Sequence, residues 1–189
     1  MKKKLVILAS GSGSNAENIV DFYAENEAVE VLSIATNKKD AGVIARAEKL
    51  DVPVLVFSKD ELQNPSKFTA LMKKLNPDLI ILAGFLLQVP DHLIEAFAHK
   101  IINIHPALLP NFGGKGMFGM NVHKAVKKAG DSFSGITIHY VNEKYDDGEI
   151  IFQAKTPISE NDQPVDIANK IHVLEHEHFP KVIDSILNK

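Results

Sequence analysis

The chain has 189 residues, of which 45% are hydrophobic and 24% are charged, and this balance is typical of one globular domain. Its formal net charge of -3 provides no general attraction toward nucleic acid or an anionic membrane, so we expect neither as a partner. The absence of cysteine excludes a disulfide scaffold, a thiolate metal site and a cysteine nucleophile.

Short apolar runs recur along the chain and predict strands that are buried on both faces. These runs are residues 5–9, 29–35, 53–57, 79–83 and 101–104. Polar segments of helical length, with apolar residues spaced about 3.6 positions apart, lie between them. This alternation predicts an α/β protein with a doubly wound, mostly parallel sheet of the Rossmann-like kind.

The first apolar run could be mistaken for part of a targeting segment. It has five residues and a polar stretch follows at once, whereas the apolar core of a signal peptide needs about 7–15 residues. No run approaches the roughly 20 apolar residues that cross a bilayer. We therefore expect a soluble, cytoplasmic protein.

The pattern changes after residue 130. Residues 136–141 and 149–154 predict two strands joined by a short loop, which is an antiparallel extension of the sheet. A terminal helix is expected to begin near Pro164, because proline suits a first turn, and Pro180 is expected to kink or break it. Without repeats or linkers, residues 1–189 are predicted to form one domain.

A glycine-rich loop, Gly11-Ser12-Gly13-Ser14-Asn15-Ala16, follows the first predicted strand and opens a helix. Its glycines permit a tight turn, and the free N–H groups of a helix start favour an anion. The spacing also fits a dinucleotide fingerprint, but residues 36–39 at the end of the second strand contain no acid to hold a ribose. A phosphate monoester is therefore the favoured ligand, and a merely tight turn is the alternative.

His105 directly follows the fifth apolar run, at the edge of the sheet where open α/β folds bind ligands. Alternation along the strand places Asn103 on the same side, and an amide beside an imidazole can bind an oxyanion. Two polar core residues would give the same pattern.

Asp146 precedes Asp147 and Gly148 in the loop between the last two strands. A carboxylate there could orient a histidine and raise its pKa. Ordinary turn chemistry is the alternative interpretation.

Residues 172–176 read His-Val-Leu-Glu-His, which matches a zinc-protease pattern with both histidines on one helical face. A catalytic zinc commonly takes a third protein ligand, and Glu177 and Asp184 are the only acidic residues that follow. A polar helix face explains the pattern more simply, so we expect no metal.

Together these segments resemble the folate-dependent formyltransferases, and within them the branch that formylates glycinamide ribonucleotide. The resemblance runs through nearly the whole chain. It is carried by residues 9–15, by Pro-Asp-Leu-Ile-Ile-Leu-Ala-Gly-Phe at 77–85, by Asn-Ile-His-Pro-Ala-Leu-Leu-Pro at 103–110, by Asp146 to Gly148, and by Glu175-His176.

The resemblance implies an enzyme that transfers the formyl group of 10-formyltetrahydrofolate to the amine of glycinamide ribonucleotide in purine synthesis. It implies that Asn103 and a protonated His105 stabilise the oxyanion of the tetrahedral intermediate. Asp146 would keep His105 charged and assist proton transfer to the leaving folate nitrogen. The folate is then a dissociable co-substrate, and both substrates are small molecules.

The resemblance also implies binding roles. The phosphate would be bound by Gly13, Ser14 and Asn15, and the ribose hydroxyls by Glu175. The pterin would be bound by Leu86, Leu87, Gln88 and Val89, with Asn103 also contacting the folate. We therefore divide the domain into a phosphate-binding half, about residues 1–100, and a catalytic and folate-binding half, about residues 101–189.

Three residues depart from the family pattern. Ala107 stands where the family usually has serine, and we expect a changed loop hydrogen bond with little loss of chemistry. Asp147 and Glu149 replace a small residue and a proline beside Asp146.

Other readings remain open at this stage. Formyltetrahydrofolate deformylase shares the Asn-His-Asp site but usually carries an N-terminal regulatory domain, and methionyl-tRNA formyltransferase adds a C-terminal tRNA-binding domain; we expect neither addition here. A sugar-nucleotide formyltransferase is a further alternative. From a different class, a catalytically silent nucleotide-binding module would keep the loop and lose the chemistry. The oligomeric state, monomer or homodimer, is also open.

Overall fold

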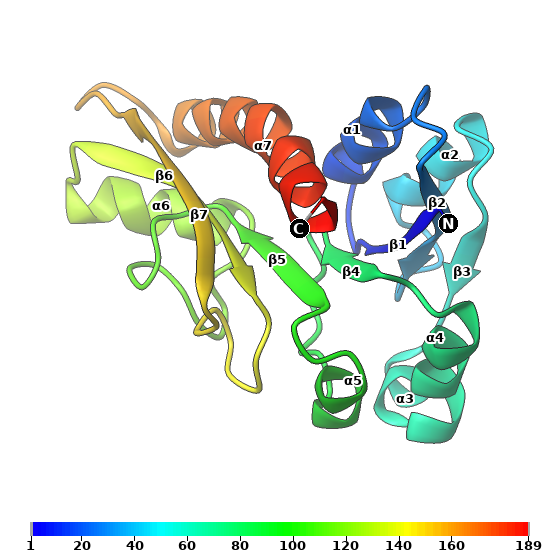
Figure 1. The fold of residues 1–189 in the computed structure, drawn as a ribbon. Helices are drawn as coiled ribbons and strands as arrows, with labels where there is room; N and C mark the ends of the chain where they lie inside the picture. Colours follow the sequence, from blue (N-terminus) through cyan, green and yellow to red (C-terminus); the bar gives the residue numbers. More distant parts are fainter. Residues whose placement is uncertain (1, 189) are drawn as a thin grey trace.

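A computed structural model describes residues 2–188 and contains a seven-stranded sheet with helices on both faces (Figure 1). The strands are β1 (Lys3–Leu8), β2 (Val29–Thr36), β3 (Val54–Val56), β4 (Leu79–Leu82), β5 (Ile101–His105), β6 (Phe133–Tyr140) and β7 (Ile150–Pro157). The helices are α1 (Ser14–Phe22), α2 (Gly42–Lys49), α3 (Lys59–Gln63), a π-helical turn η1 (Pro65–Thr69), α4 (Ala70–Leu75), α5 (Asp91–Ala96), α6 (Met120–Ala129) and α7 (Pro164–Leu187).

The strand order is β3-β2-β1-β4-β5-β6-β7. Strands β1 to β5 pair in parallel, whereas β6 runs antiparallel to β5 and β7 runs antiparallel to β6. The predicted doubly wound, mostly parallel sheet with an antiparallel extension is therefore confirmed.

Strand β1 shows why the apolar runs are continuous rather than alternating. Leu5 and Ile7 point to the face covered by α1, α2, α6 and α7, and Val6 and Leu8 point to the face covered by α3, η1, α4 and α5. All four side chains are fully buried. Each such burial contributes about 1.5–3 kcal/mol, so both faces require apolar residues.

The order in which strands are added to the sheet reverses at β1, because β2 and β3 lie on one side of it and β4 lies on the other. The segments that leave the carboxyl ends of β1 and β4 therefore diverge. A crevice opens at such a point in open α/β sheets, which places a ligand site there.

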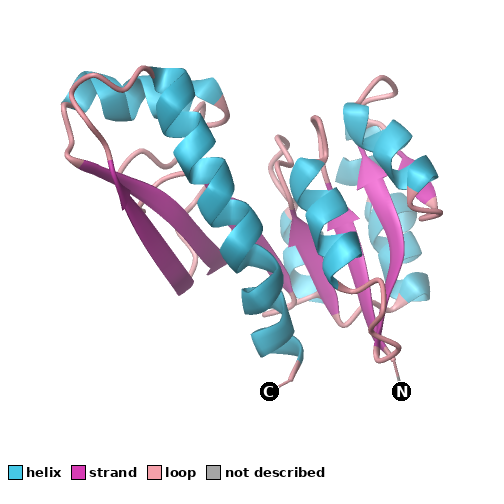
Figure 2. Ribbon diagram, turned by 90° about the horizontal axis from the view of Figure 1, so that it is seen from above, coloured by secondary structure: helices cyan, strands magenta, loops and turns pink. Residues whose placement is uncertain are grey.

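Helix α7 begins at Pro164 as expected and lies across the sheet (Figure 2). It continues without a break through Pro180, so the expected break is wrong. Proline lacks the N–H that would bond the carbonyl of His176 four residues earlier. The side chain of Asn18 in α1 donates to that carbonyl at 2.9 Å, and the carbonyl of this turn stays satisfied.

Candidate active site

A cavity of about 870 Å³ opens at the carboxyl ends of the parallel strands. Three segments that follow strands line it, namely residues 11–15 after β1, 83–86 after β4 and 103–106 at the end of β5. Helix α7 adds His172 and Glu175 to its wall. Residues that the sequence singled out in separate segments thus line a single cavity.

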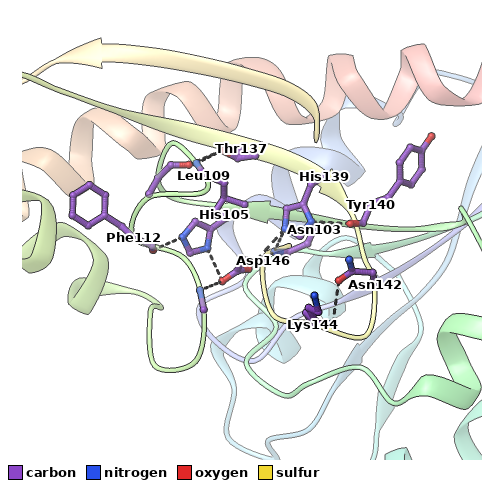
Figure 3. A network of polar contacts seen from close by, with 12 residues as sticks. Asn103, His105, Leu109, Phe112, Thr137, His139, Tyr140, Asn142, Lys144 and Asp146 are labelled. Atoms are coloured by element: carbon purple, nitrogen blue, oxygen red, sulfur yellow. Dashed lines mark hydrogen bonds and ion pairs between the residues drawn. The ribbon is translucent and has the colours of Figure 1, made fainter. Parts of the chain in front are cut away.

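Asn103, His105 and Asp146 all line this cavity, and their side chains point toward one another (Figure 3). An oxygen of the Asp146 carboxylate lies 3.5 Å from Nδ1 of His105, and the other lies 3.5 Å from Nδ2 of Asn103. The backbone of Asp146 has a φ of 53°, in the left-handed region, and the amide of Gly114 donates to its carboxylate at 2.9 Å. The following Gly148 has no room for a side chain, because a Cβ there would overlap the carbonyl oxygen of Tyr140.

The ring of His105 has a defined tautomer. Its Nε2 lies 2.8 Å from the carbonyl oxygen of Phe112, which can only accept a hydrogen bond (Figure 3). Nε2 therefore carries a hydrogen in every charge state, and Nδ1, which faces Asp146, is the nitrogen that titrates. The side chain is 3% exposed.

The charge state of His105 in the free protein differs from the protonated form that the resemblance implies for the reaction. Burial lowers the pKa of His105 below its usual value, and this outweighs the opposing effects of Asp146 and of the Phe112 hydrogen bond. Asp146 therefore does not hold the ring charged in the free protein. Burial alone would raise the pKa of Asp146, but the rings of His139 and His105 and the Gly114 amide together lower it. The pair is a neutral imidazole beside an ionised carboxylate.

His139 belongs to this cluster, although the sequence suggested no role for it. Its Nδ1 donates to the carbonyl of Tyr140 at 2.8 Å, and its Nε2 lies 3.1 Å from Nδ2 of Asn103 (Figure 3). The antiparallel register of β5 and β6 pairs Asn103 directly with His139. Knowledge of that register would have placed His139 beside Asn103.

The glycine loop lines the end of the cavity beside the start of α1. Gly13 is buried with a φ of +80°, and a Cβ there would lie 2.5 Å from Cβ of Val43. Helix α1 starts at Ser14 without a side-chain cap, so its first N–H groups are available to an anion.

Arg46 of α2 also lines this end, and no feature of the sequence marked it. Its Nε donates to the carbonyl of Ser12 at 2.9 Å, and its guanidinium pairs with Glu17. A cation is thereby held against the loop that the sequence assigned to phosphate.

Glu175 connects helix α7 to the loop. Its carboxylate accepts from Nδ2 of Asn15 at 2.9 Å and lies 3.4 Å from Nδ1 of His172, a hydrogen bond that raises the pKa of His172. The rings of His172 and His176 pack with centroids 4.0 Å apart and their planes tilted by 53°. Within residues 2–188, no group of three or more metal-ligating side chains is placed to hold an ion, and His172 and Glu175 of the zinc-like motif line the cavity.

The segment expected to bind the pterin is only partly at the cavity. Leu86 lines it, and its N–H donates to Oγ of Ser10 at 3.0 Å. Among the described residues, Leu87, Gln88 and Val89 are not part of the lining. Gln88 instead donates to the carbonyl of Glu143 at 2.9 Å, which ties this segment to the loop that carries Asp146.

The three departures from the family pattern lie around the catalytic loops. The carbonyl of Ala107 accepts from Oγ1 of Thr137 at 2.7 Å, so the backbone of this loop is held by a side chain of β6. Asp147 and Glu149 are exposed, and Asp147 lies 3.7 Å from Nζ of Lys144.

Comparison with known proteins matches residues 3–183 to the family model described as formyl transferase. The chain is 40% identical over 191 residues to the chloroplastic phosphoribosylglycinamide formyltransferase of Arabidopsis thaliana, covering 98% of this chain but only 65% of that protein. It is 40% identical over 190 residues to the Bacillus subtilis phosphoribosylglycinamide formyltransferase, covering 98% of this chain and 95% of the relative.

Solved structures agree with the sequence relatives. The crystal structure of glycinamide ribonucleotide transformylase 1 from Geobacillus kaustophilus superposes with a TM-score of 0.87 at 35% identity, covering 99% of this chain and all of that one. The family model, the relatives and the shared fold agree, and the chain belongs to the formyl transferase family.

Proposed function

We propose that the protein transfers the formyl group of 10-formyltetrahydrofolate to the amine of glycinamide ribonucleotide, giving formylglycinamide ribonucleotide and tetrahydrofolate in purine synthesis. The observation that carries this proposal is the convergence of Asn103, His105 and Asp146 in one cavity with the glycine loop and Glu175. Relatives whose names state this activity support it.

The two ends of the cavity suit the two ends of the acceptor. Free N–H groups at the start of α1 and the guanidinium of Arg46 provide for a phosphate dianion. Glu175 accepts hydrogen bonds and suits ribose hydroxyls. The amine of the acceptor then lies toward Asn103 and His105, where the formyl group must be.

The roles of Gly13, Ser14 and Asn15 toward the phosphate follow from the same placement. For the folate, Leu86 and Asn103 are the cavity-lining members of the proposed binding set. We assign Leu87, Gln88 and Val89 to shaping that wall through the contact between Gln88 and Glu143.

The chemistry requires stabilisation of an oxyanion and transfer of one proton. The amine attacks the formyl carbon, and the carbonyl oxygen gains negative charge beside Asn103 and His105. The titrating Nδ1 of His105 then lies between this oxygen and the Asp146 carboxylate, and two negative groups favour its protonated form. His105 is thus neutral in the free protein and becomes a cationic donor when its Nδ1 takes up the proton that the amine loses.

Asp146 remains ionised and can relay the proton that the amine loses, as the new C–N bond forms, to Nδ1 of His105. The same proton passes to the leaving folate nitrogen as its bond to carbon breaks. The long contact of 3.5 Å between Asp146 and Asn103 leaves that N–H available to the oxyanion.

The test is release of tetrahydrofolate from 10-formyltetrahydrofolate by the purified protein, with and without glycinamide ribonucleotide. Release that depends on the ribonucleotide is the expected result. Equal release without an acceptor would identify a deformylase instead. No release from a folded protein would refute the proposal and favour a silent module or another formyl acceptor.

A cytoplasmic location stays a prediction, because the relatives include chloroplastic proteins. Among the helices of residues 2–188, none has both the length and the apolar character of a membrane span. We propose small molecules as the partners, with the choice between monomer and homodimer open.

A further inference from the structure

His123 is a buried histidine that the proposed chemistry does not use. It lies in the first turns of α6, between the buried Val122 and Val126, and is 6% exposed. It nevertheless lines the cavity. Within the described chain, its Nδ1 is buried without a hydrogen-bond partner. An unpaired polar side chain at this depth is rare in a native interior and calls for a physical explanation.

His123 lines the same cavity as Glu175 of α7 and His105 of β5. Its titration responds to the charge of Glu175 at the ribose end and to that of His105 at the catalytic end. In the proposed acceptor, the amide joins the ribose to the methylene that carries the amine. A cavity-lining group that responds to both charges is therefore placed to contact the amide of an acceptor bound in this way.

The charge and tautomer of His123 limit what it can recognise. Burial lowers the pKa of His123, so the ring is neutral near pH 7. A buried N–H without an acceptor is less tolerated than a lone pair without a donor, which places the hydrogen on Nε2 rather than on the buried Nδ1. Nε2 also has no protein partner in the described chain, but unlike Nδ1 it is not fully buried. Because His123 lines the cavity, Nε2 is the nitrogen that reaches it.

We propose that His123 is a specificity residue whose Nε2–H donates to the amide carbonyl oxygen of glycinamide ribonucleotide. This inference rests on the proposed function and adds the part of the acceptor that no other assigned side chain contacts. A neutral donor suits a neutral carbonyl. It selects an amide at this position over an acceptor that offers only a methylene.

The test compares three substitutions of His123 with a packing control. His123→Leu removes the donor, His123→Gln returns an amide N–H near the place of Nε2, and His123→Asn places its amide near Nδ1. Val126→Ala, one turn further along α6, loosens the same buried face without removing a donor. KM for the ribonucleotide, KM for the folate and the thermal midpoint are measured for each variant.

Loss of one neutral hydrogen bond predicts a rise in the ribonucleotide KM of about fivefold to tenfold for the leucine and asparagine variants. The glutamine variant should return to within about twofold of the wild type. The folate KM should be unchanged, and the control should lower the thermal midpoint without changing either KM. An unchanged ribonucleotide KM in His123→Leu would overturn the inference, as would equal effects of leucine and glutamine.

Calorimetric binding of an acceptor analogue, in which a methylene replaces the amide carbonyl, gives a measurement that does not depend on turnover or on the variants folding. The wild type should bind this analogue about fivefold to tenfold more weakly than the ribonucleotide. Equal affinity would overturn the inference. Failure of the proposed function is distinguishable, because the wild type would then show no ribonucleotide-dependent release of tetrahydrofolate.

Discussion

Gly13 of the phosphate loop is the position where the smallest change should have a large effect on stability. Its φ is +80°, and a Cβ added there would lie 2.5 Å from Cβ and 2.7 Å from the backbone Cα of Val43. The left-handed conformation costs a residue with a Cβ about 1–2 kcal/mol, and overpacking of a close-packed interior adds about 1–3 kcal/mol. Because the neighbour is partly backbone, the clash has no rotamer to relieve it. We expect Gly13→Ala to lower the free energy of unfolding by about 2–5 kcal/mol.

Two other glycines separate the two contributions. A Cβ on Gly84 meets nothing within 4 Å but has the same conformational penalty, because its φ is +76°. A Cβ on Gly11 also meets nothing within 4 Å, and the φ of Gly11 is not in the left-handed region. We therefore expect a loss of about 1–2 kcal/mol for Gly84→Ala and less than about 0.5 kcal/mol for Gly11→Ala.

The assay is equilibrium unfolding in urea, supported by the thermal midpoint. For a chain of this length, each kcal/mol corresponds to about 2–4 °C, so Gly13→Ala should lower the midpoint by roughly 5–15 °C. The reasoning fails if Gly13→Ala and Gly84→Ala are equally stable, because the contact with Val43 would then carry no energy. It also fails if Gly11→Ala is the least stable of the three.

Asp146→Asn should lower turnover about a hundredfold to ten-thousandfold, because it removes the ionised proton acceptor, and tetrahydrofolate release measures this; a loss below tenfold would exclude that role. The pKa values of His105 and His123 are lowered by burial, so the unfolded chain binds protons first as the pH falls below about 6.5. The free energy of unfolding should therefore fall between about pH 7 and pH 5, and His123→Leu should reduce that slope, as measured by urea unfolding at both values. An unchanged slope in this variant would show that the buried ring does not contribute. Oγ1 of the fully buried Thr137 bonds Ala107 and receives bonds from Leu109 and Gln153, so Thr137→Val should cost about 2–4 kcal/mol. Thr137→Ser keeps the hydroxyl and should cost about 1 kcal/mol, and equal losses in the two variants would contradict this account.

The positions of the five parallel strands could be predicted from the sequence, because strands buried on both faces form continuous apolar runs. The five apolar runs all appear as strands, since a parallel sheet between two helical layers leaves no polar position in its centre. The ends of strands were less well predicted. Residues 53–57 contain only a short strand, β3 (Val54–Val56), at the edge of the sheet, where a single neighbour sets its length.

The path of α7 shows what a local rule omits. Pro180 removes one N–H, and the sequence gives no indication that Asn18, more than 150 positions away, satisfies the carbonyl that is left free. The rule for proline describes an isolated helix. Tertiary hydrogen bonding can keep such a helix continuous.

The sequence singled out Asn103, His105 and Asp146, and the structure brings them together, but the sequence did not predict their charge state. The sequence favours a raised pKa for His105 because it places a carboxylate nearby. The structure buries the ring to 3% exposure, and desolvation outweighs that carboxylate. Burial depth depends on packing by distant segments and has no local signal.

Other functional groups had no signal at all. The acceptor for His105 is the backbone carbonyl of Phe112, and any residue supplies a carbonyl. Arg46 lies on the polar face of α2, and it reaches the cavity because α2 packs beside the glycine loop. His139 lies beside Asn103 only because of the register between β5 and β6, and no local sequence pattern marks that register.

The central claim is that this cavity moves a formyl group from folate nitrogen to an amine. The most direct measurement uses 10-formyltetrahydrofolate with an isotopically labelled formyl group and follows the label by NMR and mass spectrometry. The account predicts that the label appears on the amine nitrogen of glycinamide ribonucleotide, that it does so at a rate matching tetrahydrofolate release, and that this transfer is abolished in Asn103→Ala and His105→Ala. Label recovered as free formate, or transfer that persists in both variants, would contradict it.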